Sequence, residues 1–370
     1  MNKKIVCLTY QSFPSKKANS IATIATLKSF RKLGYDVELI FPNRRKDSSS
    51  DLNELQTFYE FNEYIKIKKL SHNLPFEKFS KFELLLFVIS HFIWSIKVVL
   101  KNGNNKNDFY YTRSDWILLF LALRGRKVIF ECHNYSRIRS LIFKFVKNKS
   151  HVLIVFNNDS LLNYFSYSGP NFVVVNSGFD EDEFLNRSVK KINKKVIFIG
   201  HLLRFEKGRN IEFLINAFKD SRLQDFKLVI AGGPKNYALT LSEQVTTKNI
   251  QIAGWLKRKE VINLILESEV GILINSEDTM HSKVFTSPIK YFEYLRGGLK
   301  VLAVDFTSHR SLPYSEDITF FSNNDKEDFI NKLINLYPLS KTEKDMYSFS
   351  YIERTKNIIA RLEGLEPPTL

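Results

Sequence analysis

Short apolar runs alternate with amphipathic stretches of helical length along most of the chain. Neighbouring parallel strands need a long crossover, usually a helix, so this alternation is typical of parallel sheets covered by helices. The predicted strands are, in chain order, Ile5–Thr9, Asp36–Phe41, Ile65–Leu70, Asp108–Tyr111, Val128–Cys132, His151–Val155, Val173–Asn176, Lys195–Ile199, Lys227–Ala231, Ile250–Ala253, Val270–Asn275 and Lys300–Val304. The clearest helical stretches are Ile21–Leu33, Leu84–Leu100, Asn210–Lys219, Val261–Glu267 and Pro288–Leu295. The pattern therefore predicts an α/β protein.

A chain of 370 residues is too long for one ordinary hydrophobic core and suits two domains. Residues 186–194 are polar and basic without periodicity, so they are the best candidate for a linker. We therefore expect one Rossmann-like domain over residues 1–185 and a second over residues 195–340. A C-terminal helix over 341–362 is expected to pack back on the N-terminal domain, and residues 363–370, with two prolines, to form a loose tail.

The longest apolar stretch is Leu84–Leu100, which contains His91 and Lys97. Seventeen residues with a charge inside are a poor match to a membrane-spanning helix. We expect a core or groove-lining helix. An interfacial membrane helix stays open as the alternative, because lysines flank the stretch on both sides, at Lys78, Lys81 and Lys101.

The formal net charge is +16, and residues 1–185 carry +10 of it, with 27 Lys or Arg against 17 Asp or Glu. A basic surface of this kind favours nucleic acid, anionic lipid or phosphorylated substrates without distinguishing among them, and a generally basic proteome would give the same composition. The two cysteines, Cys7 and Cys132, lie in strand-like runs without a His or Cys neighbour at metal-ligand spacing. They predict buried thiols in a reducing compartment and no metal site. The N-terminus leads straight into a strand without a signal-peptide pattern, so we expect a cytoplasmic protein.

The segment SPIKYFEYLRGG has the sequence of a short helix that follows a strand. Ser287 suits the N-cap, Pro288 the first helical position, and Gly297 and Gly298 the end. Free N–H groups and the helix dipole make such a start an anion site. Glu293 lies five residues beyond the proline, about 7.5 Å along the axis, which suits a carboxylate that accepts ribose hydroxyls. An incidental Glu on a capped surface helix is the alternative.

Two further clusters follow predicted strands. Residues 200–209 (GHLLRFEKGR) form the first βα loop of the second domain, where such domains receive phosphates, and Arg204, Lys207 and Arg209 supply cations. A solvated basic loop is the alternative. Glu131 and His133 follow the strand in the first domain, where polar groups face the crevice of an open sheet. His133 is either a ligand contact or a structural partner.

The order of these motifs resembles the retaining GT-B glycosyltransferases of glycosyltransferase family 4 (group 1). The resemblance is densest in VIFIGHLLRFEKGRNIEFLINAF, LVIAGGP, NIQIAGWLKRKEV and SPIKYFEYLRGGLKVLAVD, and VVVNSGFDEDEF is similar to the end of the family's first domain. Within residues 1–134, KKANSIATIATLKSFRKLGYDVELI and YYTRSDWILLFLALRGRKVIFECHN also have family character. The resemblance implies two Rossmann-like domains that face across a cleft, the GT-B fold.

The resemblance also implies roles for individual residues. Glu293 would bind the ribose of a nucleotide-sugar donor, and Lys207 with Arg204 or Arg209 would neutralise its diphosphate. Ser287 and the N–H groups after Pro288, beginning with Ile289, would hold a phosphate, beside the glycines Gly200 and Gly232. His133 would contact the transferred sugar, and Asn19 and Ser20 would face the acceptor or the phosphates.

Two departures from the family pattern stand out. The family often carries a second glutamate eight residues before the ribose-binding one, where this chain has Phe285, so backbone groups would have to bind the sugar or the donor preference would differ. The glycine pair after the first strand is replaced by QSFPSKKANS.

The implied activity is a retaining hexosyltransferase that uses a UDP- or GDP-sugar, with electrostatic stabilisation of the leaving diphosphate and no cofactor or metal. The expected acceptor is a glycan or a polyprenyl-lipid-linked glycan of bacterial surface polysaccharide, such as lipopolysaccharide or capsule. The basic N-terminal half favours peripheral binding to the anionic inner face of the cytoplasmic membrane. A sugar-nucleotide epimerase of the same architecture is the first alternative. Nucleic-acid binding lacks a recognisable motif, and an oxidoreductase lacks G-x-G-x-x-G after the first strand.

Overall fold

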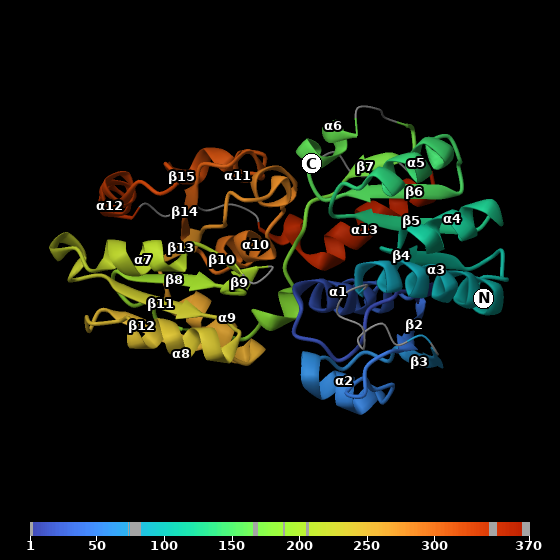
Figure 1. Ribbon diagram of the computed structural model, residues 1–370, viewed down its shortest axis with the longest axis horizontal. Helices are drawn as coiled ribbons and strands as arrows, with labels where there is room; N and C mark the ends of the chain where they lie inside the picture. Colours follow the sequence, from blue (N-terminus) through green and yellow to red (C-terminus); the bar gives the residue numbers. More distant parts are fainter. Residues whose placement is uncertain are drawn as a thin grey trace. The chain divides into compact units, whose positions relative to one another are not determined.

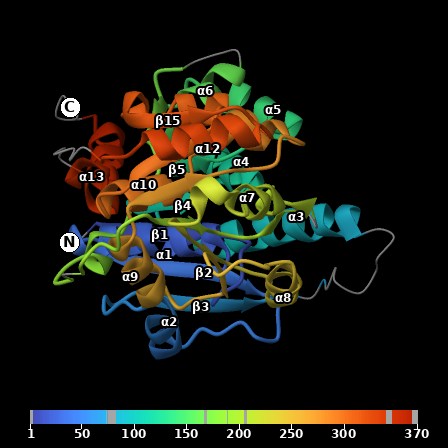
Figure 2. The same cartoon turned by 90° about the vertical axis from the view of Figure 1, so that its left-hand side faces the viewer.

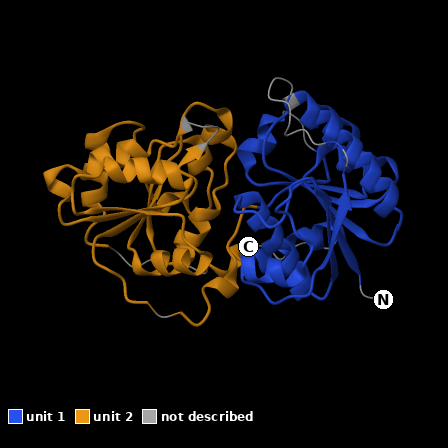
Figure 3. Ribbon diagram, turned by 60° about the horizontal axis from the view of Figure 1, so that its bottom comes forward, with its two compact units in different colours: residues 1–175, 351–370 blue, residues 176–350 orange. Residues whose placement is uncertain are grey.

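The computed structural model describes residues 3–72, 74, 83–165, 169–187, 189–204, 207–339 and 346–364, and for Leu84, Arg204 and Lys207 it describes the backbone alone. The chain divides into two compact units (Figure 3). Unit 1 comprises Met1–Val175 with Tyr351–Leu370, and unit 2 comprises Asn176–Ser350. The predicted tail lies mostly outside the described residues, which end at Gly364.

Unit 1 is built on a seven-stranded parallel sheet with the order β3-β2-β1-β4-β5-β6-β7 (Figure 1). Its strands are β1 (Lys4–Leu8), β2 (Asp36–Asn43), β3 (Lys66–Ser71), β4 (Phe109–Thr112), β5 (Lys127–Cys132), β6 (Val152–Phe156) and β7 (Phe172–Val174). Both faces of such a sheet are covered by helices, which explains the continuous apolar runs of the sequence.

The helices of unit 1 are α1 (Ala18–Lys32), α2 (Leu52–Tyr59), α3 (Glu83–Asn102), α4 (Asp115–Leu123), α5 (Arg137–Val146), α6 (Asp159–Tyr164) and α13 (Tyr351–Leu362). Helices α1 and α13 pack together, and Ile24 and Ile358 share a core with Ile5 and Cys7 of β1. Helices α3, α4 and α5 pack side by side in that order. The chain therefore returns to unit 1 for its last described helix.

Unit 2 is built on a six-stranded parallel sheet with the order β12-β11-β8-β13-β14-β15. Its strands are β8 (Lys195–Ile199), β11 (Lys227–Ala231), β12 (Ile250–Gly254), β13 (Val270–Leu273), β14 (Lys300–Val304) and β15 (Ile318–Phe321), and β9 (Leu203–Arg204) and β10 (Lys207–Gly208) form a small antiparallel hairpin.

The helices of unit 2 are α7 (Ile211–Phe218), α8 (Lys235–Glu243), α9 (Arg258–Glu267), α10 (Ile289–Arg296), α11 (Thr307–Arg310) and α12 (Lys326–Asn335). Alternate residues of β8 point to opposite faces of the sheet. Phe198 lies in one core with residues of α7, α8 and α12, and Ile197 lies in the other with residues of α9 and α10.

The division between the units differs from the expected linker at 186–194. The segment after Val175 belongs to unit 2, because Phe179 is fully buried in its core. Arg187 donates to the side chain of Asn263 at 2.7 Å, and the Lys191 ammonium donates to the carbonyls of Ser268 and Gly297 at 2.5 and 2.8 Å. Arg187 and Lys191 are thus bound to backbone and amide oxygens of unit 2, whereas the composition of the segment indicated a solvated linker.

Helix α3 contains the longest apolar stretch and can be followed in Figure 2. Its side chains are buried on one side only. Trp94 and Val98 are fully buried, but Leu85, Ile89 and Ile93 are exposed on the opposite side. By length and composition, residues 85–102 are also apolar enough to cross a membrane, yet only 28% of that window is buried inside unit 1. Helix α3 is therefore a core helix on one side, and its apolar outer side agrees with the interfacial alternative.

Candidate functional site

The strand order of each sheet contains a topological switch point, where the chain connections leave two neighbouring strands in opposite directions. Chain connections run to opposite sides from β1 and β4 in unit 1, and from β8 and β13 in unit 2. In open parallel sheets, ligands bind beyond the carboxyl ends of the strands at this switch point. The sequence-predicted site residues follow these strands or their neighbours in each unit.

In unit 2, two glycines lie in contact where β8 and β11 end. A Cβ atom built on Gly232 would lie 1.7 Å from the carbonyl oxygen of Gly200, and both residues have φ values, +157° and +150°, that disfavour side chains. The Gly200 N–H donates to the Ala231 carbonyl at 2.9 Å. The two predicted donor-site glycines are thus brought together, and their backbones leave room at the start of the basic loop.

The basic loop contains the hairpin of β9 and β10. Arg204 and Lys207 are paired in it by their backbones, but their side chains lie outside the described residues. Arg209 follows the hairpin, and its N–H donates to the Leu202 carbonyl at 3.1 Å. The loop therefore returns Arg209 to the end of β8.

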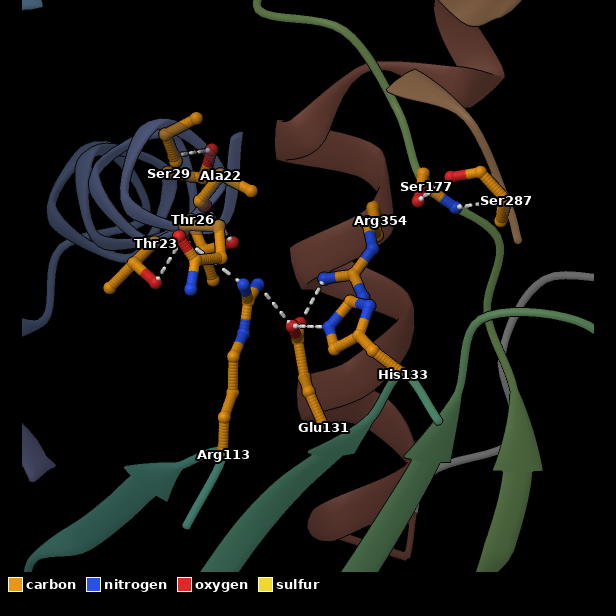
Figure 4. A network of polar contacts seen from close by, with 12 residues as sticks. Ala22, Thr23, Thr26, Ser29, Arg113, Glu131, His133, Ser177, Ser287 and Arg354 are labelled. Carbon is orange, nitrogen blue, oxygen red and sulfur yellow. Dashed lines mark hydrogen bonds and ion pairs between the residues drawn. The ribbon is translucent and has the colours of Figure 1, made fainter. Parts of the chain in front are cut away.

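The helix of the SPIKYFEYLRGG segment, α10, begins at Ile289, one residue later than expected, and Pro288 is its N-cap without a side-chain hydrogen bond. The Ser287 hydroxyl accepts the Ser177 N–H at 3.4 Å, and the Ser177 hydroxyl donates to the Ser287 carbonyl at 3.0 Å (Figure 4). Ser287 therefore ties the segment that follows β7 to the start of α10, whereas the sequence indicated an N-cap. The first N–H groups of α10 remain without a side-chain cap.

Glu293 is buried in α10, with 3% of its surface exposed, and is held by Arg258 at the start of α9. Arg258 also grips Glu183 with two hydrogen bonds, Nε to Oε1 at 2.7 Å and Nη2 to Oε2 at 2.5 Å. Burial lowers the pKa of Arg258, but the two carboxylates outweigh it and raise that pKa well above its ordinary value. Arg258 is thus a fixed cation that orients Glu293, and Glu183 fixes Arg258.

Phe285, at the position of the family's second glutamate, is 5% exposed and ends a short π-helical turn, His281–Phe285. Its ring belongs to the interior of unit 2, so its side chain offers no acceptor to a sugar.

In unit 1, Glu131 at the end of β5 is surrounded by three cationic or titratable groups (Figure 4). Arg113 Nη2 and Arg354 Nη1 lie 2.5 and 2.6 Å from its carboxylate oxygens, and His133 Nε2 lies 3.1 Å from Oε2. Burial raises the pKa of this carboxyl, but Arg113 and then Arg354 outweigh burial and hold that pKa well below its ordinary value. Glu131 is therefore ionised, and it joins β4, β5 and α13.

The same cluster keeps His133 neutral. Burial, followed by the charge of Arg113, lowers the pKa of His133 to about 4. A neutral imidazole beside an ionised carboxylate donates its Nε2–H to it, which leaves Nδ1 as the acceptor. The predicted sugar contact is thus an oriented, uncharged ring with about a third of its side chain exposed.

Asn19 and Ser20 begin α1 and have different surroundings. The Asn19 carbonyl accepts from Arg113 Nη1 at 3.1 Å, which brings the start of α1 to the Glu131 cluster. Ser20 is buried, and its hydroxyl donates to Gln11 at 3.3 Å. Asn19 is exposed and Ser20 is enclosed, so the structure separates a pair that the sequence treated alike.

Residues 193–338, which lie within unit 2, match the family model of glycosyl transferases group 1. Unit 2 is a group 1 glycosyltransferase domain. The chain is also 23% identical over 200 residues to the alpha-1,3/1,6-mannosyltransferase ALG2 of Candida glabrata. That match covers 46% of this chain and 43% of the mannosyltransferase, so the chain corresponds to less than half of that protein's length.

Solved structures with the same fold span nearly the whole chain. A glycosyltransferase from Rickettsia africae superposes with a TM-score of 0.62 at 13% identity and covers 98% of this chain and 95% of its own. WaaG, a glycosyltransferase involved in lipopolysaccharide biosynthesis, gives 0.58 at 11% identity, over 96% of this chain and 99% of its own. An E. coli trehalose-6-phosphate protein bound with UDP-2-fluoro glucose gives 0.59 at 9% identity, over 98% and 96%. The fold is the GT-B fold, with two Rossmann-like units.

Three arginines hold buried glutamates in a way that the sequence did not reveal, Arg258 in the group 1 domain and Arg113 and Arg354 in unit 1. Arg258 stands in the basic run LKRKEV, and Arg113 and Arg354 lie far from Glu131 in sequence, so none carried a local signal. In the part of the chain that the structure describes, no group of three His, Cys, Asp or Glu side chains is placed to hold a metal ion.

Proposed function

We propose that the protein transfers a hexosyl group from a UDP- or GDP-sugar to a glycan or polyprenyl-lipid-linked acceptor with retention of anomeric configuration. The observation that carries the proposal is the placement of Glu293, fixed by Arg258, behind the uncapped start of α10 within the group 1 domain. The helix start suits a phosphate, and a carboxylate about one turn further suits the ribose hydroxyls. A nucleoside diphosphate matches that spacing.

The chemistry of the proposed transfer is electrostatic. As the glycosidic bond breaks, negative charge grows on the diphosphate, and cations placed beforehand at the basic loop stabilise it. The loop supplies Arg204, Lys207 and Arg209 after β8. The departing diphosphate accepts the proton of the acceptor hydroxyl, which attacks from the same face. No protein nucleophile is required in this scheme.

A binding screen tests the donor class. We expect UDP, GDP or one of their sugars to raise the melting temperature, with ADP and TDP as comparisons. Lys207→Ala should lower kcat far more than it raises KM, because the charge acts mainly in the transition state. Unchanged turnover would remove Lys207 from the role. Release of free sugar or an epimer without any acceptor would instead indicate an epimerase.

The proposed lipid-linked acceptor is supported by an apolar face on α3, α4 and α5. Phe92 of α3 contacts Trp116 and Phe120 of α4, at ring-centroid distances of 4.9 and 5.6 Å, so the outer sides of these helices are continuous. Helix α5 packs beside α4 and adds Leu141, which is 68% exposed. The large exposed side chains of this three-helix face are Leu85, Val88, Ile89, Phe92, Ile93, Leu100, Leu123, Ile138, Leu141 and Phe145. A contiguous exposed apolar surface of this kind marks a membrane or partner interface.

The charge around the three-helix face favours an anionic membrane as its partner. Residues 83–149 contain twelve Lys or Arg against four Asp or Glu. Lys101, Arg137 and Lys144 are exposed on the three helices, and Lys149 lies 4.7 Å from the ring centroid of Phe145. Apolar side chains inserted at the interface and lysines beside the headgroups act together. We propose peripheral binding to the inner face of the cytoplasmic membrane.

Flotation with liposomes tests this part of the proposal. The protein should bind phosphatidylglycerol-containing vesicles at low salt, and Leu141→Asp should weaken binding about tenfold or more because it places a charge in the apolar face. Leu239→Asp is the matched control, since Leu239 is 53% exposed on α8 of unit 2. Equal binding by both variants, or none by the wild type, would refute the membrane assignment.

A further inference from the structure

Lys290 is the second residue of α10, and its side chain lies against the backbone at the start of the basic loop. Its Nζ lies 4.2 Å from the centroid of the buried Phe198 ring in β8. A Cβ atom built on Gly200 would lie 2.9 Å from Nζ and 3.4 Å from Cε. The ammonium therefore lies where β8 ends and the basic loop begins, and only a glycine at position 200 leaves room for it.

The surroundings of this ammonium are unfavourable for a cation. Burial, and then the charge of Arg209, hold the pKa of Lys290 well below its ordinary value, and the opposing effect of Glu293 is the smallest of the three. Glu293 is already engaged by Arg258. On the other side, His309 of α11 is buried, with its pKa lowered to about 4, and it contributes no charge near neutral pH. The charged form of Lys290 is thus disfavoured by burial and by the neighbouring charge of Arg209, beside a helix start.

Such an arrangement is stabilised by an anion, because a negative charge near both side chains offsets their mutual repulsion and their desolvation. A diphosphate bound at the start of α10 would lie at the helical turn that carries Lys290, with Arg209 in the basic loop as a second nearby cation. We propose that Lys290 binds the diphosphate of the nucleotide donor and takes up a proton as the diphosphate arrives. The inference rests on the proposed function, and it adds a residue and a pH dependence to the donor site.

The alternative to the proposal is that Lys290 only packs its aliphatic stem on the Phe198 ring, and two substitutions distinguish the roles. Lys290→Met keeps the length of the stem and removes the charge, and Lys290→Arg keeps a charge that does not titrate. Packing alone predicts that the methionine variant binds donors normally. If Lys290 binds the diphosphate as a permanent cation and takes up no proton, the arginine variant should match the wild type in both affinity and buffer dependence.

Isothermal titration with UDP and GDP separates these outcomes. Above about pH 7.5 the terminal phosphate is ionised, so proton uptake reports on the protein. The wild type should show a binding enthalpy that depends on the ionisation enthalpy of the buffer, HEPES or Tris, and an affinity that falls from pH 7.5 to 9. Lys290→Met should bind about 10- to 100-fold more weakly, without buffer dependence.

Lys290→Arg should retain most of the affinity while losing the buffer dependence, and Lys219→Met, at an exposed position of unit 2, should equal the wild type. Wild-type affinity in Lys290→Met, or undiminished proton uptake in Lys290→Arg, would overturn the inference and leave the proposed function standing. A wild type that binds no nucleoside diphosphate would overturn both.

Discussion

Each unit contains a buried glutamate fixed by arginine, but the two clusters have opposite charge balances. In unit 1, the single carboxylate of Glu131 lies between Arg113 and Arg354. In unit 2, the single guanidinium of Arg258 lies between Glu183 and Glu293. The first cluster therefore has one cation in excess, and the second has one carboxylate in excess.

The sign of the excess charge gives the two clusters different consequences for a ligand in the proposed site. Glu131 is fully engaged by protein groups, so its effect reaches outward only through His133, which it orients and which Arg113 helps to keep neutral. Glu293 shares its arginine with a competing carboxylate, and Arg258 contacts its Oε1. Under the proposed function, Glu293 accepts the ribose hydroxyls. Unit 1 thus uses a buried charge to position another side chain, and in the proposed donor site unit 2 uses one to bind the ribose.

The largest effect is expected from breaking the unit 1 cluster. Glu131→Gln leaves Arg113 and Arg354 buried without a counter-charge, which should lower the free energy of unfolding of unit 1 by about 3–5 kcal/mol. Urea denaturation followed by Trp94 and Trp116 fluorescence, in a Trp255→Phe background, measures it. Arg222→Ala, which removes an exposed ion pair of unit 2, is the control. A midpoint as little changed as in that control would contradict the buried-charge account.

The next effect separates ligand presentation from stability. Glu293→Ala should weaken nucleoside diphosphate binding by about 1.5–3 kcal/mol, because a charged acceptor of hydroxyl groups is lost. Arg258 keeps Glu183 as its partner, so unit 2 should remain folded. Titration calorimetry measures the affinity, with the exposed Glu243→Ala as control. Nucleotide affinity equal to that of the wild type would remove Glu293 from the ribose role.

The sequence predicted the strands well because buried parallel strands are continuous apolar runs between turn residues. It missed α4, whose sequence DWILLFLAL is apolar almost throughout and therefore shows no amphipathic period. It also placed the domain boundary after residues that fold with unit 2, because lysine contacts to carbonyl oxygens have the composition of a solvated linker.

Candidate site residues could be proposed from the sequence where a local motif carries the chemistry. Glu293, Gly200 and Gly232 follow from a helix start and from strand ends, each visible within a few residues. Arg354 acts on Glu131 across more than two hundred residues of chain, and only the return of α13 to unit 1 brings them together. In sequence, Lys290 resembles any lysine on the surface of a helix. Its position beside the basic loop depends on the space that Gly200 leaves for its ammonium.

A matched pair of substitutions tests how firmly each cluster is held. Arg258 forms two hydrogen bonds with Glu183, so Arg258→Lys, which cannot keep both, should cost about 1–3 kcal/mol of unit 2 stability. Arg354 approaches Glu131 Oε1 through Nη1 at 2.6 Å, an ion pair that a lysine ammonium can also form, so Arg354→Lys should cost about 1 kcal/mol or less. Hydrogen exchange of the backbone amides in the two sheets reports the stability of each unit separately, so it measures the loss that each variant causes. Equal losses would erase the proposed difference between the clusters.

The smallest expected effect concerns the proton that His133 does not carry. Its pKa is lowered to about 4 in the fold, whereas an unfolded histidine titrates near 6.5. Between these values the unfolded chain binds more protons, so the free energy of unfolding falls as the pH falls from about 6.5 to 4.

His133→Gln should remove about 1 kcal/mol of that fall, a value reduced because about a third of the side chain is exposed. His91, also lowered to about 4 by burial, keeps its own share in the variant. Denaturation between pH 4.5 and 6.5, above the range where Glu131 titrates, should therefore show a shallower slope without a flat profile. A slope identical to the wild type would mean that the ring is charged in the fold, and His133 would then present a cation to the sugar where the Glu131 cluster indicates a neutral acceptor.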